Sequence, residues 1–378
     1  MDESRDLQPF DRLSPLSTGE SLWLDLVRGL AAQAVVVGHA LAFMEIYPGP
    51  GDAHPLHVQN GGVVVFFVLS GFLISYTVFQ KRSRAEYNLT TYLGDRFCRI
   101  GTAYLPALVF IAVLDVLYIR TFGVEQYQFG NALDLKTLVG NIVMLQDHPV
   151  WDLFRNRLRV VPTGTITSFG SGRPLWTVAI EWWLYMFYGI VIFWASVAGG
   201  KIGRLTLLCL LLIVPLYNIG GRGNGLTLIW FSGACILLLR DTKLGRLRPK
   251  VALAVVGAVI LAIVQRSRVV ELEMYDPVLG SLFAVVILFV LIALRGVQIL
   301  PNGLPVRCIR FIADYSFSLY LVHYSVLLFV VGFRLRVGSW PLFAVAVTAS
   351  NLVAILFASL TEFHHRKLRV LLHHRFGI

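Results

Sequence analysis

The chain has 378 residues, of which 56% are hydrophobic and only 15% are charged, and its net charge is +11. Soluble domains of this length carry about 25% charged residues, so the composition excludes an ordinary soluble protein and indicates that most of the surface faces lipid. An excess of basic residues would favour nucleic-acid binding in a soluble protein. Here the Lys and Arg residues stand in short segments between apolar stretches, as in membrane loops, and we therefore expect no nucleic-acid partner.

Ten apolar stretches are long enough to be membrane-crossing helices. A helix that crosses the ~30 Å hydrocarbon core needs about 20 mostly apolar residues. The stretches are, in chain order, 22–46, 60–79, 100–119, 174–196, 204–219, 225–240, 250–265, 278–295, 314–333 and 341–361. Because they are continuous in Leu, Val and Ile rather than alternating, they exclude a β-barrel. We predict an all-α, polytopic integral membrane bundle of about ten transmembrane helices.

The basic residues predict how this bundle lies in the membrane. If the N-terminus is inside, the inner segments hold 21 of the Lys and Arg residues and the outer segments hold 11. Cytoplasmic loops carry the excess of positive charge, so we expect both termini in the cytoplasm and a multi-pass protein of the inner (plasma) membrane. The domain organisation is then a cytoplasmic tail at 1–20, one transmembrane domain at 21–362 and a basic tail at 363–378.

The first predicted helix carries three ionisable residues. Such residues are costly inside a membrane and are functional candidates by default. Arg28 and His39 are eleven residues apart, which places them on one face of the helix and about 16 Å apart along its axis. Asp25 lies one turn before Arg28 and can pair with it. In the alternative interpretation, Asp25 and Arg28 anchor the helix at the interface, and His39 bonds to a neighbouring helix.

Further candidates stand in or beside later helices. Arg96 and Arg99 fall in the inner loop before the third helix, where guanidinium groups suit phosphates, although positive-inside bias alone would also place them there. Glu181, in the fourth helix, falls at the depth of His39 and could orient the imidazole; alternatively it is a buried carboxyl bonded to Tyr185, Trp182 or a backbone carbonyl. His323, in the ninth helix, either lines a polar channel or bonds across helices. The four cysteines are far apart, so we expect neither a disulfide framework nor a metal site.

Five motifs, in order, resemble those of the membrane acyltransferase-3 family, whose members O-acylate cell-surface sugars and similar acceptors. They are Leu-Asp-x-x-Arg-Gly with a following His (Asp25, Arg28, His39), Phe-Phe-x-x-Ser-Gly-Phe (Phe66 to Phe72, with Ser70), Arg-x-x-Arg-Ile (Arg96, Arg99, Ile100), Trp-Thr-x-x-x-Glu (Trp176, Thr177, Glu181) and Ser-x-Ser-x-Tyr-x-x-His (Ser316, Ser318, Tyr320, His323). The resemblance runs from about residue 20 to residue 362. The chain departs from the family at Val64 and Val65, where an acidic residue is frequent, at the delayed Pro106, and at Glu362-Phe363-His364 in place of Glu-x-Pro.

The resemblance implies an acyl-CoA donor, expected to be acetyl-CoA, and a hydroxyl of a carbohydrate or glycolipid acceptor on the outer side. His39 would be the catalytic base, with Glu181 and Arg28 beside it in the catalytic group. Binding of the donor is expected from the remaining motif residues, which are Arg96, Arg99, Asp25, His323, Ser70, Tyr320 and Trp176. Two other classes stay open, namely a transporter or flippase of a lipid-linked sugar and a nonenzymatic membrane sensor. The acceptor's identity, the acyl length and the oligomeric state are left open.

Overall fold

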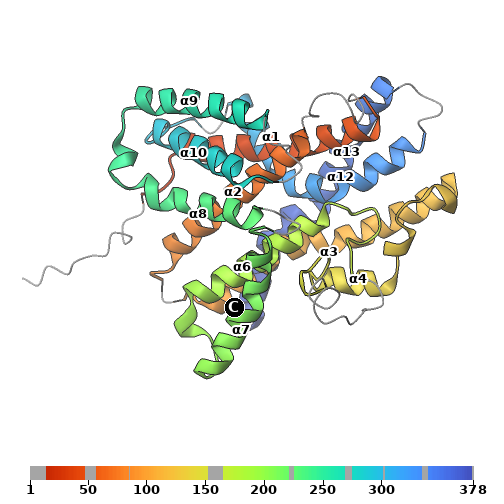
Figure 1. Ribbon diagram of the computed structural model, residues 1–378, viewed down its shortest axis with the longest axis horizontal. Helices are drawn as coiled ribbons and strands as arrows, with labels where there is room; N and C mark the ends of the chain where they lie inside the picture. The colour runs from red at the N-terminus through yellow and green to blue at the C-terminus, as the bar shows by residue number, and fades with distance from the viewer. Residues whose placement is uncertain are drawn as a thin grey trace, which may run out of the picture.

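The computed structural model describes residues 14–46, 57–84, 86–151, 165–220, 225–268, 275–300, 303–333 and 339–376. The secondary structure of these residues is entirely helical, which confirms the predicted all-α class. The long helices pack along one another in a single bundle (Figure 1). Its α-helices are α1 (Thr18–Phe43), α2 (Val58–Lys81), α3 (Leu89–Phe122), α4 (Leu135–Ile142), α6 (Leu175–Ile192), α7 (Lys201–Tyr217), α8 (Leu226–Arg240), α9 (Pro249–Ser267), α10 (Pro277–Ala293), α11 (Leu304–Asp314), α12 (Ser316–Val331), α13 (Ser339–Leu360) and α14 (His365–Phe376).

Each of the ten predicted stretches overlaps a helix, but fewer helices are long enough to cross a membrane. Among the described residues, six helices are long and apolar enough: α1, α2, α3, α6, α9 and α13, the last continuing to Leu371. The pair α11 and α12, bent by 58°, makes a seventh if it is one span. The apolar helices α8 and α10 have only 15 and 17 residues. The chain is thus a multi-pass helical membrane protein, while the count of ten and the cytoplasmic termini stay predictions.

The third helix begins much earlier than its apolar stretch. The side chain of Asn88 accepts a hydrogen bond from the backbone N–H of Thr91 and caps α3 at Leu89, eleven residues before the predicted start. With 34 residues, α3 is about 51 Å long, well above the ~30 Å of a hydrocarbon core. The placement of Arg96 and Arg99 in a loop was therefore wrong, since both lie on the first turns of this helix.

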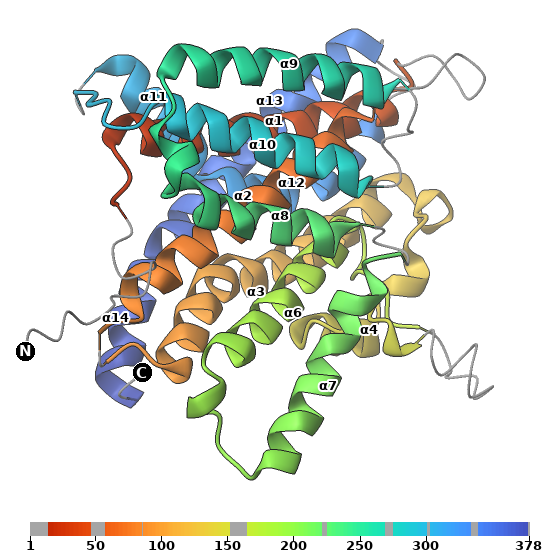
Figure 2. The same cartoon turned by 60° about the vertical axis from the view of Figure 1, so that its left-hand side comes forward.

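Helix α9 lies at the edge of the bundle, where it packs on α10 (Figure 2). Ala252 is its one buried residue. Apolar side chains such as Leu253, Ile260 and Leu261 are exposed on it. An exposed apolar helix of this kind is stable when lipid covers it, which agrees with a membrane location.

Helices α2 and α8 approach so closely that only glycine fits at their crossing. A Cβ atom added to Gly71 would lie 1.9 Å from the carbonyl oxygen of Trp230, and one added to Gly233 would lie 2.0 Å from that of Val68. Small residues permit such close packing in membranes. The crossing also lets Trp230 Nε1 donate a hydrogen bond to Ser70 Oγ at 3.0 Å.

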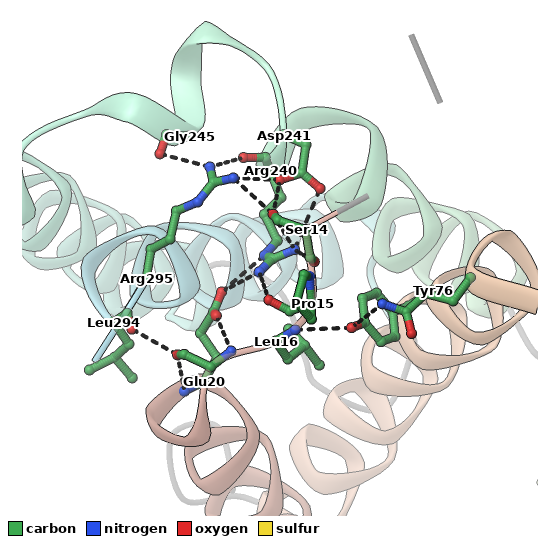
Figure 3. A network of polar contacts seen from close by, with 12 residues as sticks. Ser14, Pro15, Leu16, Glu20, Tyr76, Arg240, Asp241, Gly245, Leu294 and Arg295 are labelled. Atoms are coloured by element: carbon green, nitrogen blue, oxygen red, sulfur yellow. Dashed lines mark hydrogen bonds and ion pairs between the residues drawn. The ribbon is translucent and has the colours of Figure 1, made fainter. Parts of the chain in front are cut away.

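A buried polar network attaches the segment before α1 to α8 and α10 (Figure 3). The guanidinium of Arg240 lies 2.8 Å from Glu20 and donates to the carbonyl of Ser14 at 2.9 Å, and both charged side chains are 1% exposed. Glu20 also completes a capping box with Ser17 at the start of α1. Just after α10, Arg295 pairs with Asp241 at 2.7 Å. The network fixes where α1 enters the bundle.

Replacing Gly71 by alanine is expected to destabilise the protein by about 1–3 kcal/mol, because the new methyl group would meet backbone rather than a flexible side chain. Gly61 on the same helix is the matched control, since nothing lies within 4 Å of a Cβ added there. Gly61→Ala should be neutral or stabilising by up to ~1 kcal/mol. The measurement is the unfolding midpoint in detergent micelles, and equal midpoints for the two variants would contradict the close crossing.

The Arg240→Met substitution is expected to cost about 3–5 kcal/mol of unfolding free energy, because it leaves the Glu20 carboxylate buried without its cationic partner. The control is Arg246→Met, which removes an exposed charge and should change stability by less than ~0.5 kcal/mol. The double variant Arg240→Met with Glu20→Leu should recover part of the loss, because no buried charge is left over. A loss from Arg240→Met no larger than the control's would show that the network adds nothing to stability.

Candidate active site

The candidate site is a cavity of about 370 Å³ between α1, α2, α3, α6, α12 and α14. It follows α2, whose lining residues run from Val63 to Lys81. These two positions are eighteen residues apart, which corresponds to about 27 Å along a helix. The cavity is therefore an elongated track with two chemically different ends, the Lys81 end and the Thr177 end.

The Lys81 end is strongly basic. Four cationic side chains line it: Lys81, Arg96, Arg99 and Arg369. Asp95 pairs with Lys81 at 3.0 Å and with Arg369 at 2.7 Å, while Glu362 pairs with Arg99 at 3.0 Å. Two carboxylates thus face four cations, and this end keeps an excess of positive charge that suits an anionic ligand.

Two guanidinium groups on the track keep unused donors. The Nε atoms of Arg28 and Arg96 are buried, and neither has a hydrogen-bond partner among the described residues. Arg28 pairs with Asp25 at 2.9 Å, and Arg96 lies over the ring of Tyr92 with 5.6 Å to its centre. A buried donor without a partner is costly, and a bound phosphate or carbonyl would remove that cost. Both arginines therefore fit a ligand-binding role.

The middle of the track carries a directed chain of hydrogen bonds. Trp230 Nε1 donates to Ser70 Oγ at 3.0 Å, and Tyr185 donates to Glu181 Oε1 at 2.6 Å. Ser70 and Tyr185 share a bond of 2.9 Å. Because the Tyr185 hydroxyl has one proton, which goes to Glu181, the Ser70 hydroxyl is the donor in the shared bond. Every hydroxyl is thus satisfied, and the chain ends on the Glu181 carboxylate.

The Thr177 end leads to a pair of histidines. The hydroxyl of Tyr320 bonds to Thr177 at 2.5 Å, and Tyr320 lines the cavity. One turn further along α12, the ring centre of His323 lies 6.0 Å from that of Tyr320. His323 Nε2 in turn lies 3.0 Å from His39 Nδ1 on α1. The imidazole predicted to be catalytic therefore lies just beyond the cavity, on the side away from the basic end.

The structure separates the predicted site residues into two groups. Six of them line the cavity, namely Arg28, Ser70, Arg96, Arg99, Glu181 and Tyr320. The other four, which are Asp25, Trp176, His39 and His323, are not part of its lining. Asp25 contacts Arg28, and the indole of Trp176 packs against the ring of Tyr275 at 5.9 Å. The segment between the third and fourth predicted helices also carries the basic residues Arg155, Arg157 and Arg159, which lie outside the described residues.

The predicted contact between Glu181 and His39 is not formed between these two described side chains. Glu181 bonds to Tyr185, which was the alternative interpretation, and His39 bonds to His323. The reason is local geometry, because Tyr185 lies four residues after Glu181 on α6 and brings its hydroxyl to the same helix face. His323 similarly bonds across helices, which was one of its two interpretations.

One cationic residue of the site was missed in the sequence. Tyr185, by contrast, stood among the alternative partners of Glu181, because a hydroxyl four residues after a buried carboxylate is a natural partner. Arg369 stands in the segment interpreted as a basic tail, which instead forms α14, packs against α3 and lines the cavity. No hydrophobic periodicity in the sequence predicts that contact, because α14 is polar and Arg369 makes the contact through an ion pair with Asp95.

The comparison with protein families finds one match. The acyltransferase-3 family model, described as an acyltransferase domain, matches residues 21–360, nearly the whole chain. No curated protein and no solved structure matches the chain. Helix α14 lies beyond the matched residues.

Proposed function

The chain belongs to the acyltransferase-3 family, and from this premise we propose that it moves an acyl group, in particular acetyl, from cytoplasmic acyl-CoA to a hydroxyl of an extracytoplasmic carbohydrate or glycolipid. Membership of this family indicates that the protein is a membrane acyltransferase. The observation that carries the finer proposal is the track itself, which begins at four cations and ends beside two histidines.

The basic end suits the donor's phosphates. Coenzyme A carries three phosphate groups, and Arg guanidinium groups bind phosphate through several parallel hydrogen bonds. A cavity of about 370 Å³ is near the small end of the range for ligand pockets. It suits the pantetheine arm with a short acyl group better than the whole coenzyme, so the nucleotide would stay among Arg96, Arg99 and Arg369.

The middle of the track suits the arm. The pantetheine arm contains two amide groups, whose N–H groups need acceptors once they leave water. Glu181 and Ser70 offer oxygen atoms on the cavity wall. Arg28 offers a donor for an amide or thioester carbonyl through its unused Nε. In this proposal Glu181 holds the donor and does not orient His39, which replaces the role expected from the sequence.

His39 would do the chemistry where the track ends. One of its nitrogens removes the proton from the acceptor hydroxyl, and the oxygen attacks the thioester carbonyl carbon. The C–S bond then breaks, the coenzyme A thiolate leaves and takes up the proton from the imidazolium, and an ester remains on the acceptor. An acyl-histidine intermediate would use the same imidazole nitrogen as its nucleophile. A net proton balance is kept in both routes.

The first test of this function is His39→Ala, with acyl transfer and donor binding measured separately. Surface glycans are analysed for O-acetyl esters in cells with the wild-type or variant gene, and acetyl-CoA is added to the purified proteins in a thermal unfolding assay. We expect esterification to fall by at least ~10²-fold. Stabilisation by acetyl-CoA should persist, because His39 does not line the cavity.

Two outcomes of that test would contradict the proposal. Retained esterification in the variant would remove His39 from the catalytic role. A wild-type protein that acetyl-CoA does not stabilise would contradict the acyl-CoA donor, since a ligand that binds only the native state must raise its stability. A flippase of lipid-linked sugars would show that same lack of response.

The second test is Arg96→Gln, which removes a charged group from the basic end. A hydrogen bond to a charged group contributes about 1.5–3 kcal/mol, so the Kd for acetyl-CoA should rise by about 10- to 100-fold. Arg248→Gln is the matched control, because Arg248 is exposed and does not line the cavity. Binding is measured by titrating acetyl-CoA against the unfolding midpoint, and equal affinities for both variants would place the phosphates elsewhere.

A further inference from the structure

The two histidines at the end of the track have unequal surroundings. Their ring centres lie 5.2 Å apart, with 21° between the ring planes. His323 is 0% exposed, whereas His39 is partly exposed. The ring of Tyr324 also packs edge-on against that of His39, with 5.2 Å between the ring centres. One imidazole is thus fully buried within the bundle, whereas the residue that carries the other keeps partial exposure.

The hydrogen bonds of His323 identify which of its nitrogens carries the proton. Its Nδ1 lies 3.0 Å from the carbonyl oxygen of Leu319 and 2.8 Å from that of Tyr320, both on its own helix. Carbonyl oxygens only accept hydrogen bonds, so Nδ1 must be protonated. In a neutral imidazole, Nε2 then has a lone pair and can only accept.

The protonation of His323 also determines which nitrogen of His39 carries the proton. Its Nδ1 lies 3.0 Å from His323 Nε2. Because Nε2 of a neutral His323 accepts, Nδ1 of His39 must be the donor and must be protonated. The nitrogen of His39 that keeps a lone pair is therefore Nε2.

The argument requires both rings to be neutral, and their surroundings favour that state. The ion pairs among the described residues include neither histidine. A buried cation without a carboxylate partner is costly, and two adjacent cations would also repel each other. The Nδ1–H tautomer of His39 is thus the form that the site holds before reaction.

We propose that His323 is a positioning residue that holds His39 in the Nδ1–H tautomer, so that Nε2 faces the reaction as the base or nucleophile. This inference rests on the proposed acyl transfer. When Nε2 takes the proton of the acceptor hydroxyl, the positive charge is shared with an N–H that already donates to His323. The geometry gives a neutral imidazole the task that a carboxylate has in Ser-His-Asp enzymes.

The test compares His323→Gln with His323→Asn. The Gln amide oxygen stands as many bonds from Cβ as Nε2 does, so it can accept from His39. The Asn amide reaches only as far as Nδ1, so it can bond to the carbonyl groups of Leu319 and Tyr320 but cannot reach His39. Both variants keep a polar side chain in the same place on α12, and only one keeps the acceptor.

The assay is release of the coenzyme A thiol from acetyl-CoA by the full-length protein in proteoliposomes, with membrane glycolipids as acceptors. We expect His323→Gln to keep kcat within about 10-fold of the wild type, and His323→Asn to lower it by about 10²- to 10⁴-fold. The KM for acetyl-CoA should not change in either variant, because His323 does not line the cavity. Thermal stabilisation by acetyl-CoA verifies that each variant is folded.

Equal losses of kcat in the two variants, or full activity of His323→Asn, would overturn the inference while leaving the proposed function intact. A rise in KM with unchanged kcat would likewise overturn it, because a positioning residue for the base acts on the chemical step. A wild-type protein that releases no coenzyme A would overturn the proposed function and this inference with it.

Discussion

The arrangement of this protein depends on the cost of placing charge inside an apolar bundle. Two arginines show the two ways of meeting that cost. Arg240 is 1% exposed, and its guanidinium contacts Glu20, Asp241 and backbone carbonyl groups, so its donors are used within the protein. Among the described residues Arg28 pairs only with Asp25, and it keeps a buried Nε without a hydrogen-bond partner on the wall of a cavity. The first arrangement fixes a helix, and the second leaves a donor for the proposed ligand.

The distribution of charge also makes the two ends of the cavity different. At one end, Asp95 and Glu362 offset part of the charge of the surrounding cations. In the middle, the Glu181 carboxylate is satisfied by Tyr185. At the other end the polar groups are uncharged, from Thr177 and Tyr320 to the two imidazoles. A ligand with an anionic head and a neutral arm matches this order, because each part finds complementary groups without leaving a buried charge unpaired.

Much of the fold could be predicted from the sequence, because long apolar runs in lipid have few alternatives to helices. The ends of the helices were harder to predict. The start of α3 depends on a cap by Asn88, and a single cap residue lies outside any apolar run. The lengths of α8 and α10 fall short of a full span, although their ends lie within two residues of the predicted stretches 225–240 and 278–295. The predicted stretch 314–333 begins at the bend between α11 and α12, because α11 carries Arg307 and Arg310 and was not apolar enough to be counted as part of it.

The residues of the site could be predicted from the sequence, but their hydrogen-bond partners could not. Motif spacing identified Arg28, Glu181 and His323, yet hydrogen-bond partners depend on how helices rotate against each other. Glu181 was matched with His39 by depth alone, whereas the bond to Tyr185 needs only one turn of the same helix. The position of Arg369 depends on a long-range ion pair with Asp95, which a count of basic residues in a tail cannot distinguish from a solvated surface.

The pairing of His39 with a second histidine follows from the same constraint. A carboxylate at this position would bring a buried negative charge among uncharged groups, and it would need further donors to be stable there. A neutral imidazole needs only one donor and one acceptor, and α12 supplies the acceptor from its own backbone at Leu319 and Tyr320. The helix that carries His323 thereby fixes its tautomer without help from any other element. In the proposed reaction the pair would cost little while at rest and would acquire charge only when a hydroxyl gives up its proton, which is when the growing negative charge on the substrate oxygen can offset it.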